Sequence, residues 1–147
     1  MGVTRRELLG MTPALAIPGM LEAVGNADDA KVLPSGMFPF EKMSVNKSQG
    51  AEYRAVMKGK LATGEAIEVH ETTLGAGNRP HPPHRHEHSE MWLIREGTVE
   101  LYVEGKTTQM GPGAVGFVHS NEEHGIKNVG KEAAIYFVVA IGPHVAG

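Results

Sequence analysis

One segment of the chain decides the fold, and it reads Gly77-Asn-Arg-Pro-His81-Pro-Pro-His84-Arg-His86-Glu-His88-Ser-Glu90-Met-Trp-Leu-Ile-Arg-Glu-Gly97. It holds four of the eight histidines of the chain. Side chains two residues apart in a β-strand face the same side, so His84 and His86 can direct ring nitrogens at one point, which Glu90 reaches from the next strand. Because His88 has the same parity, periodicity alone leaves the choice among these histidines open.

The composition predicts a single all-β domain. The 147 residues include 19 glycines and 9 prolines but only 4 phenylalanines and 1 tryptophan, which is typical of short strands joined by tight turns. No apolar run is long enough for a stable membrane span. The net charge is -3 and the basic residues are scattered, so nucleic acid is not an expected partner. Without cysteine, a metal ion would have to be held by histidine, carboxylate and water.

Short strand-like runs recur between turn signals and predict seven or eight strands closed into one barrel, which we assign to residues 51–147. The predicted strands are residues 53–58, 66–74, 91–95, 98–103, 114–118, 124–128 and 133–141. Residues 28–50 form an N-terminal arm, and from residue 31 onward this arm reads as irregular chain or an edge strand, without a helix.

The histidine segment resembles the first motif of the cupin superfamily. His84-Arg-His86, three residues, Glu90, six residues and Gly97 follow that pattern, with one extra residue after Gly77. The second cupin motif is similar to the stretch from Gly113 through His124 to Asn128, with His119 and Asn121 in place of its usual proline and glycine. The resemblance covers roughly residues 65–141 and implies a double-stranded β-helix, or jelly-roll, barrel.

The resemblance also implies a metal site. In cupins the positions of His84, His86, Glu90 and His124 bind one divalent transition metal ion and leave one or two positions for water or substrate. This ligand set suits iron, manganese, nickel, copper, cobalt or zinc. Its net positive charge would favour an enolate, carboxylate or hydroxide in the open position. A solvated or supporting role is expected for the remaining histidines of the motifs, His81, His88 and His119.

The interior of the barrel is expected to form the walls of a pocket, or simply the core. Trp92 and Ile94 share the parity of Glu90 and are expected to point inward. Phe117, Ile126 and Tyr136 are expected to complete the lining. Asn128, four residues after His124, is expected either to orient that ligand or to hydrogen-bond the backbone.

For function, the resemblance implies a small-molecule metalloenzyme, with a dioxygenase ahead of an isomerase or a lyase. The alternative is a non-catalytic module that captures a small ligand, because the same fold and site serve both roles. Cupins commonly pair through their N-terminal strands, so the arm is expected to support a homodimer.

The N-terminus is similar to a twin-arginine export signal. Thr4, Arg5 and Arg6, followed by Leu8 and Leu9, match that pattern, and small residues near 23–27 offer a cleavage site. Residues 1–27 would then be a signal peptide and the protein periplasmic or exported. The alternative is an N-terminal helix interrupted by prolines, in a cytoplasmic protein.

Overall fold

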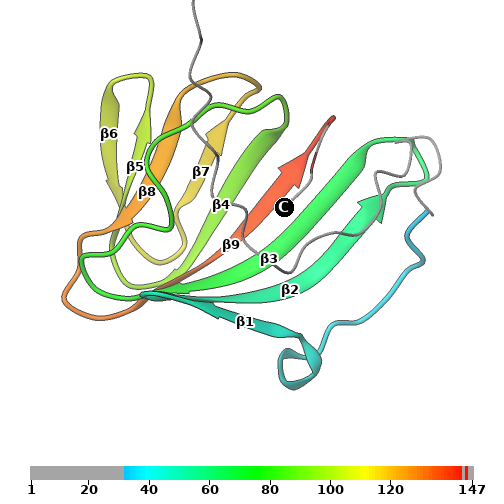
Figure 1. Cartoon of the computed structure of the whole chain (residues 1–147), viewed down its shortest axis with the longest axis horizontal. Helices are drawn as coiled ribbons and strands as arrows, with labels where there is room; N and C mark the ends of the chain where they lie inside the picture. Colours follow the sequence, from blue (N-terminus) through cyan, green and yellow to red (C-terminus); the bar gives the residue numbers. More distant parts are fainter. Residues whose placement is uncertain (1–31, 144, 146–147) are drawn as a thin grey trace, which may run out of the picture.

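The computed structural model describes residues 32–143 and 145, and in this part of the chain it contains nine strands and no α-helix (Figure 1). The prediction of an all-β fold is therefore confirmed. The strands are β1 (Val45–Ser48), β2 (Ala51–Lys60), β3 (Ala66–Leu74), β4 (Ser89–Glu96), β5 (Val99–Val103), β6 (Lys106–Met110), β7 (Val115–Val118), β8 (His124–Asn128) and β9 (Ala134–Ile141).

The described strands form two antiparallel sheets, as the jelly-roll prediction requires. The larger sheet has the order β1-β2-β3-β9-β4-β7 and the smaller has the order β6-β5-β8. Figure 1 shows the small sheet at one end of the long, curved large sheet. The last strand, β9, lies between β3 and β4 and pairs with both, from Ile67↔Ile141 to Leu74↔Ala134 on the β3 side. Strands distant in sequence are thereby joined in a single barrel.

The core lies between the two sheets. From the large sheet, Trp92, Ile94 and Tyr136 are at most 4% exposed, and Ile126 of the small sheet is also buried. The interior positions predicted for these four residues are confirmed. The prediction for Phe117 was wrong, because the register pairs it with Met91, which faces away from the interior that Trp92 occupies, and leaves it 59% exposed.

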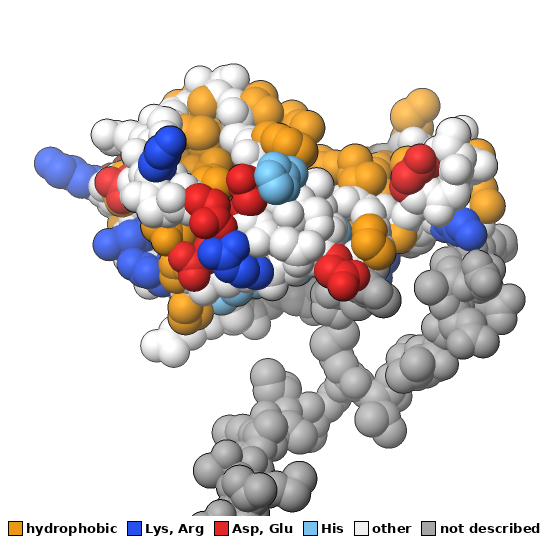
Figure 2. Space-filling model, turned by 90° about the horizontal axis from the view of Figure 1, so that it is seen from above, with side chains coloured by type: hydrophobic (Ala, Val, Ile, Leu, Met, Phe, Trp, Pro, Cys, Tyr) orange, Lys and Arg blue, Asp and Glu red, His pale blue; other side chains and the backbone are white. Residues whose placement is uncertain are grey.

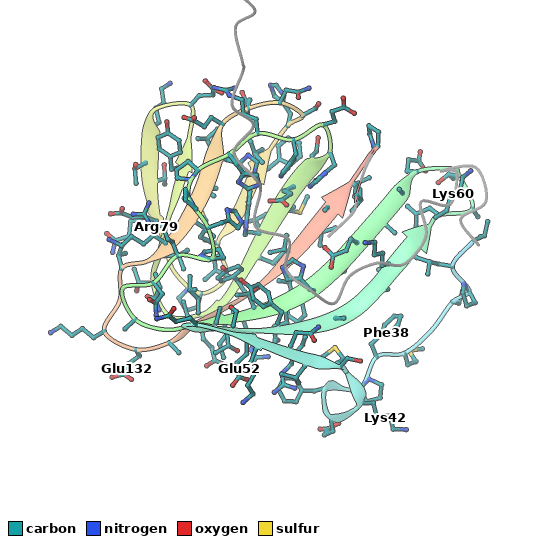
Figure 3. All side chains as sticks on the ribbon, in the orientation of Figure 1. Phe38, Lys42, Glu52, Lys60, Arg79 and Glu132 are labelled. Carbon is teal, nitrogen blue, oxygen red and sulfur yellow. The ribbon has the colours of Figure 1, made fainter. Side chains whose placement is uncertain are left out.

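The arm contributes an edge strand, β1, and a short turn of 3-10 helix at Phe40–Lys42, which the sequence analysis did not anticipate. No residue of this turn is buried, and Arg54 of β2 stacks its guanidinium 4.2 Å from the centroid of the Phe40 ring. Figure 3 shows Phe38 and Lys42 on this arm, away from the small sheet. Residues 1–31 lie outside the described part, as do the export signal and the N-terminal helix expected there.

Charge is mixed on the face seen in Figure 2. Acidic and basic side chains are interspersed over the end that carries the small sheet, beside histidine and hydrophobic side chains. Within residues 32–143 and 145, no helix is long and apolar enough to cross a membrane.

Gly97 closes the turn between β4 and β5 in a conformation that suits glycine. Its φ is +79°, and an added Cβ would lie 2.7 Å from Ala134 Cα and 2.8 Å from Ala133 O at the start of β9. Gly105 has a similar φ of +82°, but a Cβ there would meet no atom within 4 Å. The two glycines thus share the backbone requirement and differ in the space around them.

We expect Gly105→Ala to lower the free energy of unfolding by about 1–2 kcal/mol, which is the cost of the left-handed backbone alone. Gly97→Ala should cost about 1–3 kcal/mol more, because the new methyl group overlaps β9. Urea unfolding followed by circular dichroism measures both variants. Equal losses would show that β9 does not confine Gly97.

Candidate metal centre

The histidine segment is an extended loop, not the strand that the parity argument assumed. Pro80, Pro82 and Pro83 have no backbone N–H to give to a ladder, and β4 begins only at Ser89. The loop is instead fixed by an isolated antiparallel bridge to β8, in which His84 and His124 each donate the backbone N–H to the other's carbonyl at 3.0 Å. This bridge joins the two motifs of the sequence.

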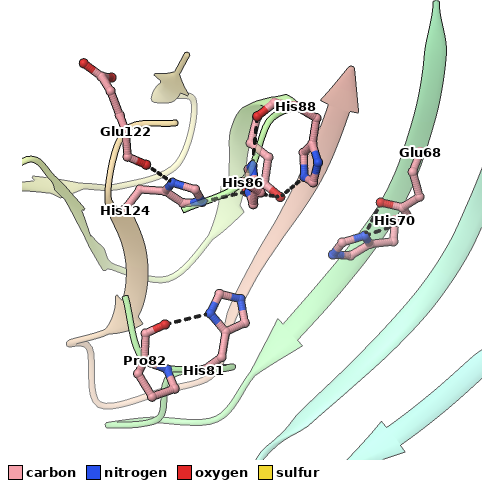
Figure 4. Close-up of polar contacts among 9 residues, drawn as sticks. Glu68, His70, His81, Pro82, His86, His88, Glu122 and His124 are labelled. Atoms are coloured by element: carbon pink, nitrogen blue, oxygen red, sulfur yellow. Dashed lines mark hydrogen bonds and ion pairs between the residues drawn. The ribbon is translucent and has the colours of Figure 1, made fainter. Parts of the chain in front are cut away.

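Four of the predicted site residues converge beside this bridge. His86 Nε2 lies 3.3 Å from Glu90 Oε1, and His124 Nε2 lies 3.6 Å from Glu90 Oε2 (Figure 4). One ring nitrogen each of His84, His86 and His124 lie within 4.8 Å of one another. Two ligand atoms held about 2.1 Å from one ion at 90–109° are about 3.0–3.4 Å apart. The two separations from Glu90 are close to that requirement.

Backbone carbonyls set the tautomers of two of these rings. His86 Nδ1 lies 2.8 Å from the carbonyl oxygen of His88, and His124 Nδ1 lies 2.8 Å from that of Glu122. Because a carbonyl can only accept, each Nδ1 carries the proton and donates it, and the neutral ring keeps its lone pair on Nε2.

Nitrogens on three of the rings are buried without a hydrogen-bond partner among the described residues. They are His84 Nδ1, His86 Nε2 and His124 Nε2, and a nitrogen of a fourth ring, His88 Nδ1, is buried without a partner as well. A buried nitrogen lone pair without a partner is destabilising, and a cation relieves that cost. The donor set therefore fits a transition metal ion.

His88 is arranged differently from the other three rings. It stacks on His86 with centroids 3.5 Å apart and planes 13° apart, whereas the planes of His84, His86 and His124 cross at 53–67°. Nitrogen lone pairs lie in the ring plane, so nearly parallel rings cannot both aim at one ion. His88 is only 11% exposed and places Nε2 3.4 Å from Glu90 Oε1, so it contacts the carboxylate and is not solvated.

The electrostatics of the cluster favour a neutral His84 and an ionised Glu90, and they favour the protonated form of His124. Burial, followed by the neighbouring rings of His81, His124 and His86, lowers the pKa of His84 to about 4. Burial alone would raise the pKa of Glu90, but His124, His86 and His88 outweigh it and lower that pKa to about 2. Burial opposes protonation of His124, yet Glu90 and the Glu122 carbonyl raise its pKa, so a metal ion would displace a proton there.

The other histidines and Asn128 lie around the cluster. The exposed His81 sets its ring edge-on to His84, 4.2 Å between centroids, and His119 lies on the surface 3.1 Å from Glu122. Asn128 is fully buried, and its amide donates to the carbonyls of Leu74 and Glu132 and accepts from the N–H of Gly130. Of the two roles predicted for Asn128, the structure thus shows the backbone one.

A cavity of about 210 Å³ borders the cluster. Glu90 and His124 form one part of its wall, and aromatic and polar side chains from β2, β3, β4 and β9 form much of the rest: Tyr53, His70, Thr72, Trp92 and Tyr136. The Tyr136 hydroxyl is buried and has no hydrogen-bond partner among the described residues. Burial raises its pKa, so the hydroxyl keeps its proton and can donate to a ligand.

His70 is the site residue that the sequence analysis missed. It lines the cavity and pairs through Nδ1 with both carboxylate oxygens of Glu68 at 3.0 Å. The sequence could have indicated it, because Glu68 and His70 are two residues apart in the predicted strand 66–74 and their side chains therefore lie on the same face of the sheet.

The cupin domain family, Cupin_2, matches residues 70–140 of the chain. L-ectoine synthase of Bordetella parapertussis is 36% identical over 62 residues, which are 42% of this chain and 47% of that protein. The chain thus spans about half the length of the curated relatives it matches.

Solved structures agree on the fold. An RmlC-like cupin from Shewanella frigidimarina has a TM-score of 0.62 and 18% identity, and the match covers 76% of this chain and 95% of that one. KdgF from a Halomonas species also has a TM-score of 0.62, with 16% identity over 73% of this chain and 94% of that one. Together with the two sheets and the His-rich site, these matches define a small jelly-roll barrel. Residues 70–140 of the chain are a cupin domain.

We expect Asn128→Ala to lower the free energy of unfolding by about 1–3 kcal/mol, because it leaves the buried carbonyl of Leu74 and the part-buried carbonyl of Glu132 without their amide donor. Asn46→Ala is the matched control, since Asn46 is exposed in β1, and it should change stability by less than about 0.5 kcal/mol. Urea unfolding measures both. A small loss at Asn128 would show that water replaces its amide.

Proposed function

We propose that this protein is a metal-dependent enzyme acting on a small molecule that carries oxygen. The observation that supports the proposal most directly is the pair of buried Nε2 atoms of His86 and His124, which have no hydrogen-bond partner among the described residues and face Glu90 at the wall of a cavity. Buried, perturbed groups at the wall of a cavity are typical of functional sites.

In this proposal His84, His86, Glu90 and His124 hold the ion. The ring-plane angles favour His84 over His88 as the third imidazole. A bound divalent ion polarises substrate oxygens as a Lewis acid. Its charge, reduced by one carboxylate, leaves a positive site that attracts carboxylate or carbonyl oxygen. Iron, manganese, nickel, copper, cobalt and zinc all accept these donors.

The class of reaction is proposed from the similarity to other proteins. The partial match to proteins named L-ectoine synthase supports catalysis at a cupin site of this kind. A dioxygenase, put first by the family resemblance, is retained as a prediction, beside an isomerase or a lyase. A module that only captures its ligand is the alternative from another class.

Two further parts of the proposal concern export of the protein and pairing of two chains. Export through the Thr4-Arg5-Arg6 signal would deliver the protein already folded, with its metal. Pairing of two chains is proposed to use the arm, whose β1 and exposed Phe38 and Phe40 provide a strand edge and apolar side chains.

Replacing Glu90 or His124 with alanine should remove most of the metal from untagged protein, which otherwise carries about one equivalent. His88→Ala should keep that stoichiometry and weaken affinity by about 10–100-fold, because His88 supports the ligands by contacting Glu90 and stacking on His86. Elemental analysis measures the metal, and circular dichroism checks that each barrel is folded. Unchanged metal in the Glu90→Ala, His124→Ala double variant would exclude this ligand set, and loss in His88→Ala equal to that in His124→Ala would assign His88 as a ligand.

Catalysis is tested by incubating the metal-loaded protein with small hydroxy and oxo acids, while oxygen uptake and product formation are recorded together. Product formed with oxygen uptake supports a dioxygenase, and product without it supports an isomerase or a lyase. Tight binding of an acid without product would favour the capture module. The double variant above serves as the metal-free control.

A further inference from the structure

We propose that His70, positioned by Glu68, is the acid–base residue of the cavity and moves a proton to and from a small 2-oxo acid. This inference rests on the proposed function and adds to it a proton-transfer group and a substrate class. It depends on the dyad in β3 that faces the same cavity as the metal cluster.

The geometry of the dyad fixes the tautomer of His70. Nδ1 lies 3.0 Å from both oxygens of the Glu68 carboxylate, so it carries the proton and donates it. The lone pair is then on Nε2, which no described residue engages in a hydrogen bond. A neutral imidazole oriented by a carboxylate is the arrangement that lets a histidine accept a proton and stabilises the imidazolium that results.

The dyad is part-buried, and its histidine lines the cavity from a different strand than the metal cluster. The side chains of His70 and Glu68 are 23% and 20% exposed. Figure 4 shows the His70 ring directed from β3 toward the side where His86 and His124 lie. His70 belongs to β3, whereas Glu90 and His124 belong to β4 and β8, and all three line one cavity. A ligand in this cavity would lie between the two sets of groups.

The pair of His119 and Glu122 is an exposed histidine–carboxylate pair with which the dyad can be compared. His119 Nε2 lies 3.1 Å from Glu122, but the His119 side chain is 65% exposed and borders no cavity described here. Such a pair contributes little energy because water screens it. It offers a matched control for His70.

The cavity limits the size and chemistry of the substrate. At about 210 Å³, and with about 30 Å³ for each water in the liquid, it has room for a molecule of about seven non-hydrogen atoms. The unpartnered Tyr136 hydroxyl offers a hydrogen bond to an oxygen, and the positive metal site attracts a carboxylate and a carbonyl. A short 2-oxo acid meets these requirements and has an acidic C–H bond next to its carbonyl.

The proposed step balances without another reactant. The C–H bond next to the carbonyl breaks and an N–H bond forms at His70 Nε2. The electron pair stays on the substrate and spreads onto the carbonyl oxygen, while Glu68 stabilises the imidazolium. Return of the proton from Nε2 to carbon completes an exchange in which nothing is oxidised or reduced.

The first test needs no substrate and no metal. Imidazole ¹⁵N shifts of the metal-free full chain should show His70 protonated at Nδ1 and bare at Nε2. Glu68→Gln should remove this preference without altering the shifts of His119. A His70 ring protonated at Nε2 in the unaltered protein would overturn the dyad.

The second test follows deuterium uptake by pyruvate and 2-oxobutyrate in D₂O, using zinc-loaded protein and mass spectrometry. The unaltered protein should exchange the protons next to the carbonyl. His70→Gln should slow exchange at least about 100-fold, as expected for loss of a general base. Glu68→Gln should slow it about tenfold, and His119→Gln should leave it unchanged.

Metal content separates the two proposals. Exchange that persists in a folded His70→Gln protein overturns the role of His70, as does the absence of exchange in unaltered protein that carries its equivalent of zinc. If the unaltered protein binds no metal, the proposed function fails, and the ¹⁵N shifts still decide whether the dyad exists.

Discussion

The functional end of this protein depends on two backbone hydrogen bonds, which His84 and His124 exchange at 3.0 Å. The loop that carries His84 and His86 is rich in proline and forms no regular strand, so isolated backbone hydrogen bonds hold it against β8 and the turn before β8, among them the bond from Asn121 N–H to the carbonyl of His86 at 2.8 Å. This bridge is the contact that sets the backbone of His84 directly against that of His124. The bridge also places His84 beside the wall of the cavity, where burial and neighbouring rings keep it neutral.

Backbone carbonyls orient the histidines of the cluster, whereas a side-chain carboxylate orients His70. Carbonyls of His88 and Glu122 hold the protons of His86 and His124, and this leaves the opposite ring nitrogens for Glu90 or a cation. On another wall of the cavity, a side-chain carboxylate does the same for His70. The main-chain carbonyls at the cluster fix the tautomers of His86 and His124. The Glu68 carboxylate fixes the tautomer of His70 and also carries a charge that stabilises the protonated ring.

Much of the fold could be predicted because its signals are local. Residues 66–74 alternate along most of their length, residues 124–128 form a short run between turn residues, and both strands are found at those bounds. The strand Lys106–Met110 was missed because its first four residues are polar or charged and exposed, so it carries no apolar period. Phe117 was misplaced because its face depends on the register with β4, which a strand's own sequence does not contain. His70 escaped notice since its partner and its cavity come together only when distant strands pair.

The anchoring of His124 by a main-chain carbonyl has an evolutionary consequence. Every residue type has a backbone carbonyl, so the side chain at position 122 can change without altering the hydrogen bond that orients the His124 ring. Residues around the mouth of the barrel can therefore diversify while the orientation of the histidines is inherited intact. A barrel of this kind can acquire new substrates by changing its rim and keep the chemistry of its interior.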